Sequence, residues 1–198
     1  MLSRNLLYKK IEDIDSVIVV KPILVRRAKL SDMISGSSNG TGGIQLMISD
    51  KLKKILESGE GDNIQFFPMS LIYKNIELKN YWLSNPHHFS QEYIDYGKSD
   101  CQFRNSLDSK KNRLIDINTQ EEFEIMMKKL VWPEWLSISR LVMCRGQRDL
   151  LVLQRVYGGV GYYVSERLKY EIEEAQCTGI EFEEIEMSDR TVNEEKTE

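Results

Sequence analysis

Ser49 and Ser165 are the first candidates for chemistry, because a serine hydroxyl is a nucleophile when a neighbouring base removes its proton. That base is usually a histidine, and the chain has only His87 and His88, adjacent in a Pro-His-His turn. Each serine instead follows a short β-prone run and precedes an acidic residue and an amphipathic segment. We therefore interpret both serines as helix N-caps, whose hydroxyls accept hydrogen bonds from free amides of the first turn.

Histidine and cysteine are the usual ligands of zinc, and neither shows a suitable pattern here. His87 and His88 have no carboxylate or further histidine at ligand spacing. The three cysteines lie far apart, without a CxxC pair. We predict no metal site and no disulfide framework, and interpret Cys101, Cys144 and Cys177 as free thiols of a reducing compartment.

Two glycine pairs and several carboxylates are the remaining candidates for a catalytic site. A phosphate-binding glycine loop lies between a strand and the helix that follows it, whereas Gly42–Gly43 and Gly158–Gly159 precede their predicted strands. Asp95 and the other carboxylates show no spacing typical of an acid–base pair. The sequence thus predicts no catalytic residue and no cofactor, and we expect a protein that is not an enzyme.

Trp132 and Trp135 allow two interpretations. They flank Pro133 in the run VWPEW, directly after a predicted helix. Tryptophan is enriched among the residues that dominate binding energy at interfaces, which favours an exposed anchor for a partner. The alternative is core packing against the end of the helix over 119–130.

The elements that would position these residues include an internal repeat. Residues 42–69 (GGIQLMISDKLKKILESGEGDNIQFFPM) and 158–185 (GGVGYYVSERLKYEIEEAQCTGIEFEEI) align without a gap at an offset of 116. Each copy predicts a strand, a helix that starts after Ser49 or Ser165, and a second strand, at Ile64–Phe67 and Ile180–Phe182. Two such units suit an α+β fold.

The segment between the copies predicts additional antiparallel strands and one helix. Residues 71–83 favour a hairpin that turns at Lys74–Asn75 or Lys79–Asn80, and Asn85–Pro86 favours a turn. Thr119 and Glu122 form the pattern of a capping box, and Pro133 ends the helix that follows. Residues 138–144 and 150–156 read as two strands joined by the turn RGQRD, and residues 35–43 as a loop.

Length and charge set the class of protein. The chain has 198 residues, 41% of them hydrophobic, and a net charge of −4. We expect one domain over residues 1–186 and a disordered acidic tail over 187–198.

From Glu171 onward the chain carries a net charge of −9, and the rest of the chain carries +5. The basic clusters 51–54 and 110–113 lack interleaved aromatic residues, so we expect no direct binding of nucleic acid.

No run approaches the roughly 18 apolar residues of a membrane-spanning helix. The N-terminal residues become charged before an apolar run of signal-peptide length develops. We therefore expect a soluble protein of the cytoplasm without a membrane partner.

The motifs of the repeat resemble a known family. YYVSERLKYEIEEAQCTGIEFEEI is similar to the C-terminal signature of bacterial polymorphic-toxin immunity proteins, and GGIQLMISDKLKKIL, NYWLSN and YIDYGKS follow that family's order of elements. The resemblance covers residues 42–185, and the chain looks like the related groups called immunity proteins eleven and forty-three. It implies a bacterial cytoplasmic protein that neutralises a secreted toxin by binding it, and it implies no catalytic residue.

The partner that the resemblance implies is a cognate toxin domain. A sharper hypothesis is that an acidic surface plugs the basic active site of a nuclease, with Glu181, Glu183, Glu184 and Glu186 beside Trp132 and Trp135 as candidate partner-binding residues. Two alternatives stay open. One is an enzyme that reverses a modification made by the toxin, and the other is a regulatory or scaffold module that has no toxin partner. The sequence does not fix the oligomeric state.

Overall fold

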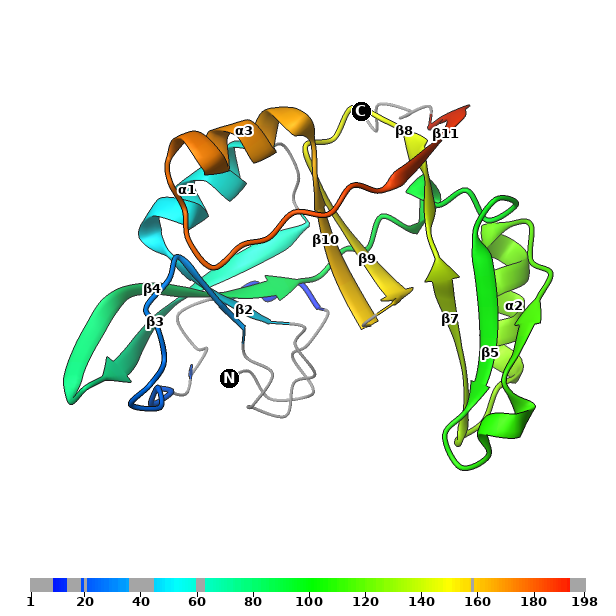
Figure 1. The fold of residues 1–198 in the computed structure, drawn as a ribbon, viewed down its shortest axis with the longest axis horizontal. Helices are drawn as coiled ribbons and strands as arrows, with labels where there is room; N and C mark the ends of the chain where they lie inside the picture. Colours follow the sequence, from blue (N-terminus) through cyan, green and yellow to red (C-terminus); the bar gives the residue numbers. More distant parts are fainter. Residues whose placement is uncertain are drawn as a thin grey trace. The chain divides into compact units, whose positions relative to one another are not determined.

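The computed structural model has an α+β fold and describes residues 9–13, 19, 21–35, 45–59, 63–157 and 159–192 (Figure 1). Where the sequence predicts one domain, the chain divides into two compact units. The first unit comprises Met1–Phe89, Arg148–Val152 and Tyr162–Phe182. The second unit comprises Ser90–Gln147, Leu153–Gly161 and Glu183–Glu198.

The first unit contains an antiparallel sheet of four strands in the order β1-β2-β4-β3. These strands are β1 (Met33–Ser35), β2 (Leu46–Ser49), β3 (Ile64–Tyr73) and β4 (Ile76–Pro86). The hairpin between β3 and β4 turns at Lys74 and Asn75, whose φ angles of 50° and 66° match the left-handed residues of a tight hairpin turn. This confirms the first of the two predicted turn positions.

The predicted turn at Asn85–Pro86 is wrong. Both residues belong to β4, where they pair with Gln65 and Ile64 of β3. Proline is tolerated here because Pro86 is the last residue of the strand and β2 pairs with β4 no further than Leu83, so the missing N–H breaks no ladder on that side.

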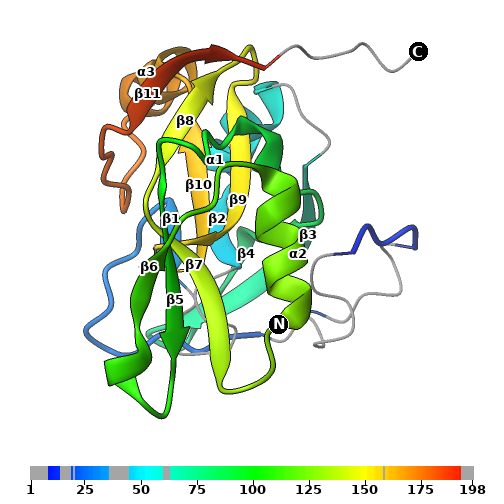
Figure 2. The same cartoon turned by 90° about the vertical axis from the view of Figure 1, so that its right-hand side faces the viewer.

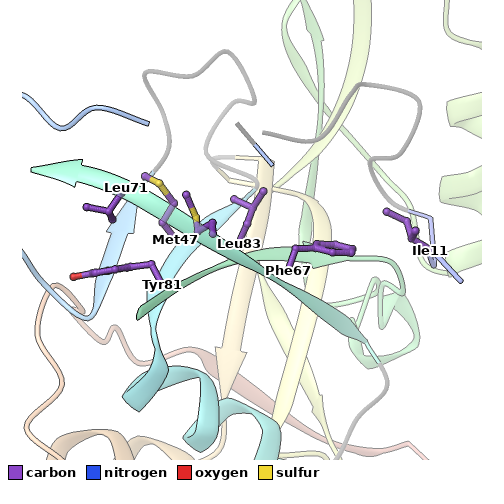
Figure 3. Packing of buried hydrophobic residues seen from close by; sticks show 7 residues of the cluster. Ile11, Met47, Phe67, Leu71, Tyr81 and Leu83 are labelled. Carbon is purple, nitrogen blue, oxygen red and sulfur yellow. The ribbon is translucent and has the colours of Figure 1, made fainter. Parts of the chain in front are cut away.

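Hydrophobic side chains cover both faces of this sheet. Phe67, Met69 and Leu71 occupy alternate positions along β3, so their side chains share one face of the sheet. On β4, Leu83 pairs with Phe67 and Tyr81 pairs with Met69, and both side chains belong to the same cluster (Figure 3). The opposite face packs against α1 (Asp50–Ser58) and α3 (Glu166–Glu174), which lie side by side (Figure 1). The cluster on that face is formed by Ile48, Leu52, Leu56, Leu150, Leu168 and Ile172.

Ser49 and Ser165 cap these two helices, as predicted. The Oγ atom of Ser49 accepts a hydrogen bond from the amide of Leu52, and that of Ser165 accepts one from the amide of Leu168, each at 3.2 Å. Gly42, Gly43 and Gly158 of the predicted repeat lie outside the described residues. The two serines have a structural role, because their hydroxyls accept hydrogen bonds from backbone amides that have no partner within the helix.

A carboxylate supports each capping serine, which extends the repeat beyond its sequence limits. Ser49 donates its hydroxyl proton to Asp32 at 2.7 Å, and Ser165 donates to Asp149. Two cations at equivalent positions pair with these acids: Lys51 lies 3.2 Å from Asp32, and Arg167 lies 2.6 Å from Asp149.

Both carboxyl groups are easier to ionise than a free aspartate. Hydrogen bonds from Arg167 and Ser165 lower the pKa of Asp149 from its ordinary value of 3.8. Burial alone would raise the pKa of Asp32, but hydrogen bonds from Ser49, Thr178 and Lys51 outweigh it and lower that pKa as well. The native structure therefore favours the charged form at both positions.

This linkage predicts how stability depends on pH. Because the folded-state pKa of Asp149 lies below the unfolded-state value, its contribution is complete above about pH 5 and is lost as the pH falls through the folded-state pKa. We expect Asp149→Asn to be less stable than the wild type at pH 7 and to lose less stability on acidification. Urea unfolding at pH 7 and at about pH 2, below the unfolded-state pKa, measures both effects. Parallel losses in the two proteins would contradict this assignment.

The second copy of the repeat differs from the prediction after its helix. Residues 175–185 form no strand, so the strand predicted at Ile180–Phe182 is wrong. Ile180 and Phe182 instead pack their side chains against the cluster of the two helices. This segment is stabilised by burial of side chains rather than by a ladder of backbone hydrogen bonds.

A five-stranded sheet has the strand order β10-β9-β7-β5-β6; β5, β6 and β7 belong to the second unit, whereas β9 and β10 are each divided between the two units. Its strands are β5 (Asp100–Asn105), β6 (Arg113–Ile115), β7 (Glu134–Arg140), β9 (Leu150–Val156) and β10 (Gly159–Val164). β5 is antiparallel to β6 and β7, whereas β7 and β9 are parallel. Two short 3-10 helices, η3 (Gln91–Tyr93) and η4 (Ser109–Lys111), complete the second unit.

Helix α2 (Gln120–Lys129) runs alongside β5 and β7 (Figure 2). It buries Phe123, whose ring lies 5.4 Å from that of Tyr96. The Oγ1 atom of Thr119 accepts a hydrogen bond from the amide of Glu122, which confirms the predicted N-cap. The Glu122 carboxylate accepts from the amide of Asn118, one residue before the position that a capping box uses.

The predicted strand over 138–144 is divided into two strands. β7 ends at Arg140, and β8 (Val142–Arg145) pairs in parallel with β11 (Glu186–Thr191) instead of forming a hairpin with β9. The main chain of Val142 also bonds to the preceding loop: it accepts from the amide of Asp95 at 2.9 Å and donates to Ser99 Oγ at 3.0 Å. With these partners, β8 does not form the hairpin with β9 that the sequence predicts.

Residues 187–191, where the sequence predicts the start of a disordered acidic tail, form most of β11. Ser188 is buried, and Val192 donates its amide hydrogen to the Arg145 carbonyl at 2.9 Å. These backbone and side-chain contacts explain why the segment is ordered in spite of its polar composition. The remaining part of the predicted tail, residues 193–198, lies outside the described residues.

Candidate protein-binding surface

Two loops meet where β5 ends and β7 begins in the second unit. The amide and the hydroxyl of Ser106 both donate hydrogen bonds to the carbonyl of Pro133, at 3.0 and 2.9 Å. Asn105 and Glu134 are partners in the adjoining sheet. The loop after β5 is thereby fixed against the loop that follows α2.

Four hydrophobic side chains project from these loops and the adjoining strand. We call them the tryptophan tip. Trp132 is 80% exposed, Val131 71%, Leu107 70% and Trp135 36%. A solvated indole is unusual in a folded protein, since tryptophan is highly buried on average. Grouped exposed apolar residues mark interaction sites more often than scattered ones do.

The exposure of Trp132 contradicts core packing for that residue, whereas Trp135 is 36% exposed and partly covered. The chain leaves α2 at Leu130 and turns, with the amide of Glu134 donating to the carbonyl of Val131 at 2.9 Å. This turn holds Trp132 outside the sheet. Trp135 lies on β7 beside Leu136, and because successive strand residues point to opposite faces, only Leu136 is fully buried.

Polar contacts support the loop after β5 and the ring of Trp135. Buried Asn105 accepts hydrogen bonds from the amides of Leu107 and Asp108 at 3.0 and 2.9 Å. The Arg104 guanidinium lies 5.2 Å from the centre of the Trp135 ring, within the range of a cation–π contact. A surface that is ordered before binding loses less entropy when a partner docks.

The acidic candidates lie on a different part of the chain, the segment between α3 and β11. Glu181, Glu183 and Glu184 are exposed, as predicted. Glu186 accepts a hydrogen bond from Arg140 Nη1 at 2.9 Å, so its charge is partly neutralised within the protein. Glu181 belongs to the first unit, whereas Glu183, Glu184 and Glu186 belong to the second.

A polar cavity of about 490 Å³ lies within the second unit. Arg140 lines this cavity and forms three hydrogen bonds there. It donates to Asp100 Oδ2 at 3.0 Å, to Glu186 at 2.9 Å and to the Lys98 carbonyl at 2.6 Å. Asp100 raises the pKa of this guanidinium further. The network ties Arg140 to its neighbours and leaves it poorly placed to bind a substrate anion.

Ser49, Ser165 and the three cysteines, all in the described part of the chain, lack the environment of an activated nucleophile. Burial raises the pKa of the Cys101 thiol to about 11 and also raises those of Cys144 and Cys177. A thiol must lose its proton to become a strong nucleophile or metal ligand, so these groups are poorly suited to either role at neutral pH. Ser49 and Ser165 engage their hydroxyls in the capping interactions described above.

The described residues contain no group of three or more histidine, cysteine or acidic side chains arranged to hold a metal ion. No helix among them is long and apolar enough to cross a membrane. No protein-family model matches the chain, and a search of curated proteins finds no significant match.

Proposed function

We propose that this protein is an inhibitor that binds and neutralises a toxin domain inside the bacterium that produces the toxin. The observation that carries the proposal is the exposed tryptophan tip, whose four side chains project from ordered backbone. The resemblance of the repeat to polymorphic-toxin immunity proteins supplies the class of partner. The mechanism is stoichiometric occlusion: the inhibitor covers a surface that the toxin needs.

Burial of Trp132 gives such a complex a large part of its binding energy. An aromatic side chain buries about 150–250 Å² when it is fully covered. Tryptophan anchors of this kind dominate the energetics of many interfaces, while surrounding contacts exclude water. Leu107 and Val131 are placed to supply these surrounding contacts, because their loops are joined through Ser106 and Pro133.

The contacts of the other polar groups favour binding over catalysis. Arg140 pairs with Asp100 and Glu186, and the two prominent serines hold helix termini. An enzyme that reverses a toxin's modification would need ionisable groups directed at its substrate. The tryptophan tip needs only a complementary pocket on the partner.

The proposal is tested by co-expression with the C-terminal domain of the protein that the neighbouring gene encodes, in a sensitive bacterial host. We expect survival to follow the molar ratio of inhibitor to toxin, and the two proteins to elute from a sizing column as a one-to-one complex. Continued killing in the presence of folded protein would contradict immunity. Protection at far below one equivalent would instead support an enzyme that repairs the damage.

A further inference from the structure

The charge around the tryptophan tip has the opposite sign to that of the whole protein. Residues 104–113 and 128–135, which form the tip and its flanks, carry six cationic and two acidic side chains and a net charge of +4. The whole chain carries −4. The cations are Arg104, Lys110, Lys111, Arg113, Lys128 and Lys129.

The fold places these cations on the elements that adjoin the tip. Lys110 and Lys111 lie in η4, shortly after Leu107, and Lys128 and Lys129 lie in the last turn of α2, just before the loop that carries Trp132. All four lysines are exposed. None of them forms a salt bridge with another residue in the described part of the chain.

The two arginines have fixed positions on the sheet. The guanidinium of Arg104 lies beside the Trp135 ring, and that of Arg113 lies 4.4 Å from the centre of the Phe103 ring. Arg113 also donates to the Lys111 carbonyl at 3.3 Å. The tip therefore combines an apolar centre with a cationic border, part of which is held in place.

We infer that the partner is a protein that presents an apolar pocket with an acidic rim, and that this pocket receives Trp132. The inference rests on the proposed function and defines which toxin surface is recognised. A basic nuclease cleft would repel the cationic border. A nuclease partner is therefore bound outside its phosphate-binding cleft, in contrast to the acidic-plug hypothesis for Glu181, Glu183 and Glu184.

An anionic membrane offers the same combination of negative charge and apolar depth, since tryptophan and lysine also favour the lipid interface. The order of the loops favours a protein, because the hydrogen bonds of Asn105 and Ser106 give their backbone a defined shape for a matching pocket.

The experiment measures association rates with the toxin domain at low and high salt. The variants are Lys110→Glu with Lys111→Glu, and Lys128→Glu with Lys129→Glu. Each pair of substitutions should slow association by about tenfold at low salt and reduce its salt dependence, because electrostatic steering would be reversed. Two first-unit lysines provide the matched control, Lys54→Glu with Lys79→Glu, which should leave the rate unchanged.

A third variant, which combines Glu181→Lys, Glu183→Lys and Glu184→Lys, separates the two electrostatic hypotheses. It should not slow association if the tip faces an acidic rim. Slower association of this variant, with normal rates for the lysine reversals, would overturn the inference but leave stoichiometric inhibition intact. Failure of the wild-type protein to bind or protect would instead overturn the proposed function, and the inference with it.

Lipid binding is tested separately with vesicles of phosphatidylcholine and phosphatidylserine. We expect no co-sedimentation of the wild-type protein and no shift of its tryptophan emission. Binding that disappears in Trp132→Ala would show that the tip recognises lipid and would overturn the inference of a protein pocket.

Discussion

Trp132→Ala is expected to weaken the complex with the toxin domain by at least about thirtyfold, which corresponds to roughly 2 kcal/mol of binding free energy. The substitution removes the most exposed side chain of the tryptophan tip. Calorimetric titration of the purified toxin domain measures the change. Trp135→Ala should have a smaller effect, because much of that ring is already covered and lies beside Arg104.

The matched control is Tyr157→Ala, which removes an aromatic side chain that is 79% exposed, close to the value for Trp132. Its binding should equal that of the wild type. Both variants should unfold within about 0.5 kcal/mol of the wild type, since surface substitutions without special contacts change stability little. A Trp132→Ala variant that is stable and binds normally would remove the tip from the interface.

The sequence predicted the features that depend on neighbouring residues. Ser49, Ser165 and Thr119 were recognised as N-caps because each capping bond spans only three residues. The carboxylates behind the first two serines were not recognised. Asp32 and Asp149 lie 17 and 16 residues before their serines, and no local pattern reports a contact across such a distance.

Strand pairing shows the same limit. The strands β8 and β11 are more than 40 residues apart in the chain and pair in parallel. No short turn connects them, so the local sequence does not predict that they pair. Ile180 and Phe182 have the alternation of a strand but pack as side chains of an irregular segment. Alternation predicts that one face is buried, and it does not predict whether a neighbouring strand is present.

The candidate surface was only partly visible in the sequence. The run VWPEW identifies two candidate tryptophans, but hydrophobicity alone does not separate an exposed anchor from a core residue. Leu107 and Asn105 had no distinguishing signal, because their importance comes from the meeting of two loops. The net charge of +4 becomes meaningful only when residues 104–113 and 128–135 are seen to adjoin the same tip.

Leu168→Ala is expected to lower the free energy of unfolding by about 3 kcal/mol, within the usual range of about 2–5 kcal/mol for a buried leucine. Leu168 is 0% exposed and packs in the cluster between α1 and α3. A Cβ atom at Gly59 would lie only 3.0 Å from Leu168 Cδ2, which shows how closely the two copies of the repeat meet. Because little space surrounds the side chain, its removal leaves a cavity that rigid helices fill poorly.

Leu52→Ala provides a direct test of the repeat. Leu52 is the equivalent residue of the first copy, is 1% exposed and belongs to the same cluster. In urea unfolding, Leu52→Ala should therefore lower the free energy of unfolding by a similar amount to Leu168→Ala. Leu107→Ala, at an exposed position, is the control and should change stability by less than about 0.5 kcal/mol. The double variant of Leu52 and Leu168 should depart from additivity by more than about 0.5 kcal/mol, because both side chains belong to one packed cluster. Strictly additive losses would mean that the two copies stabilise the first unit independently, contrary to a single core shared by α1 and α3.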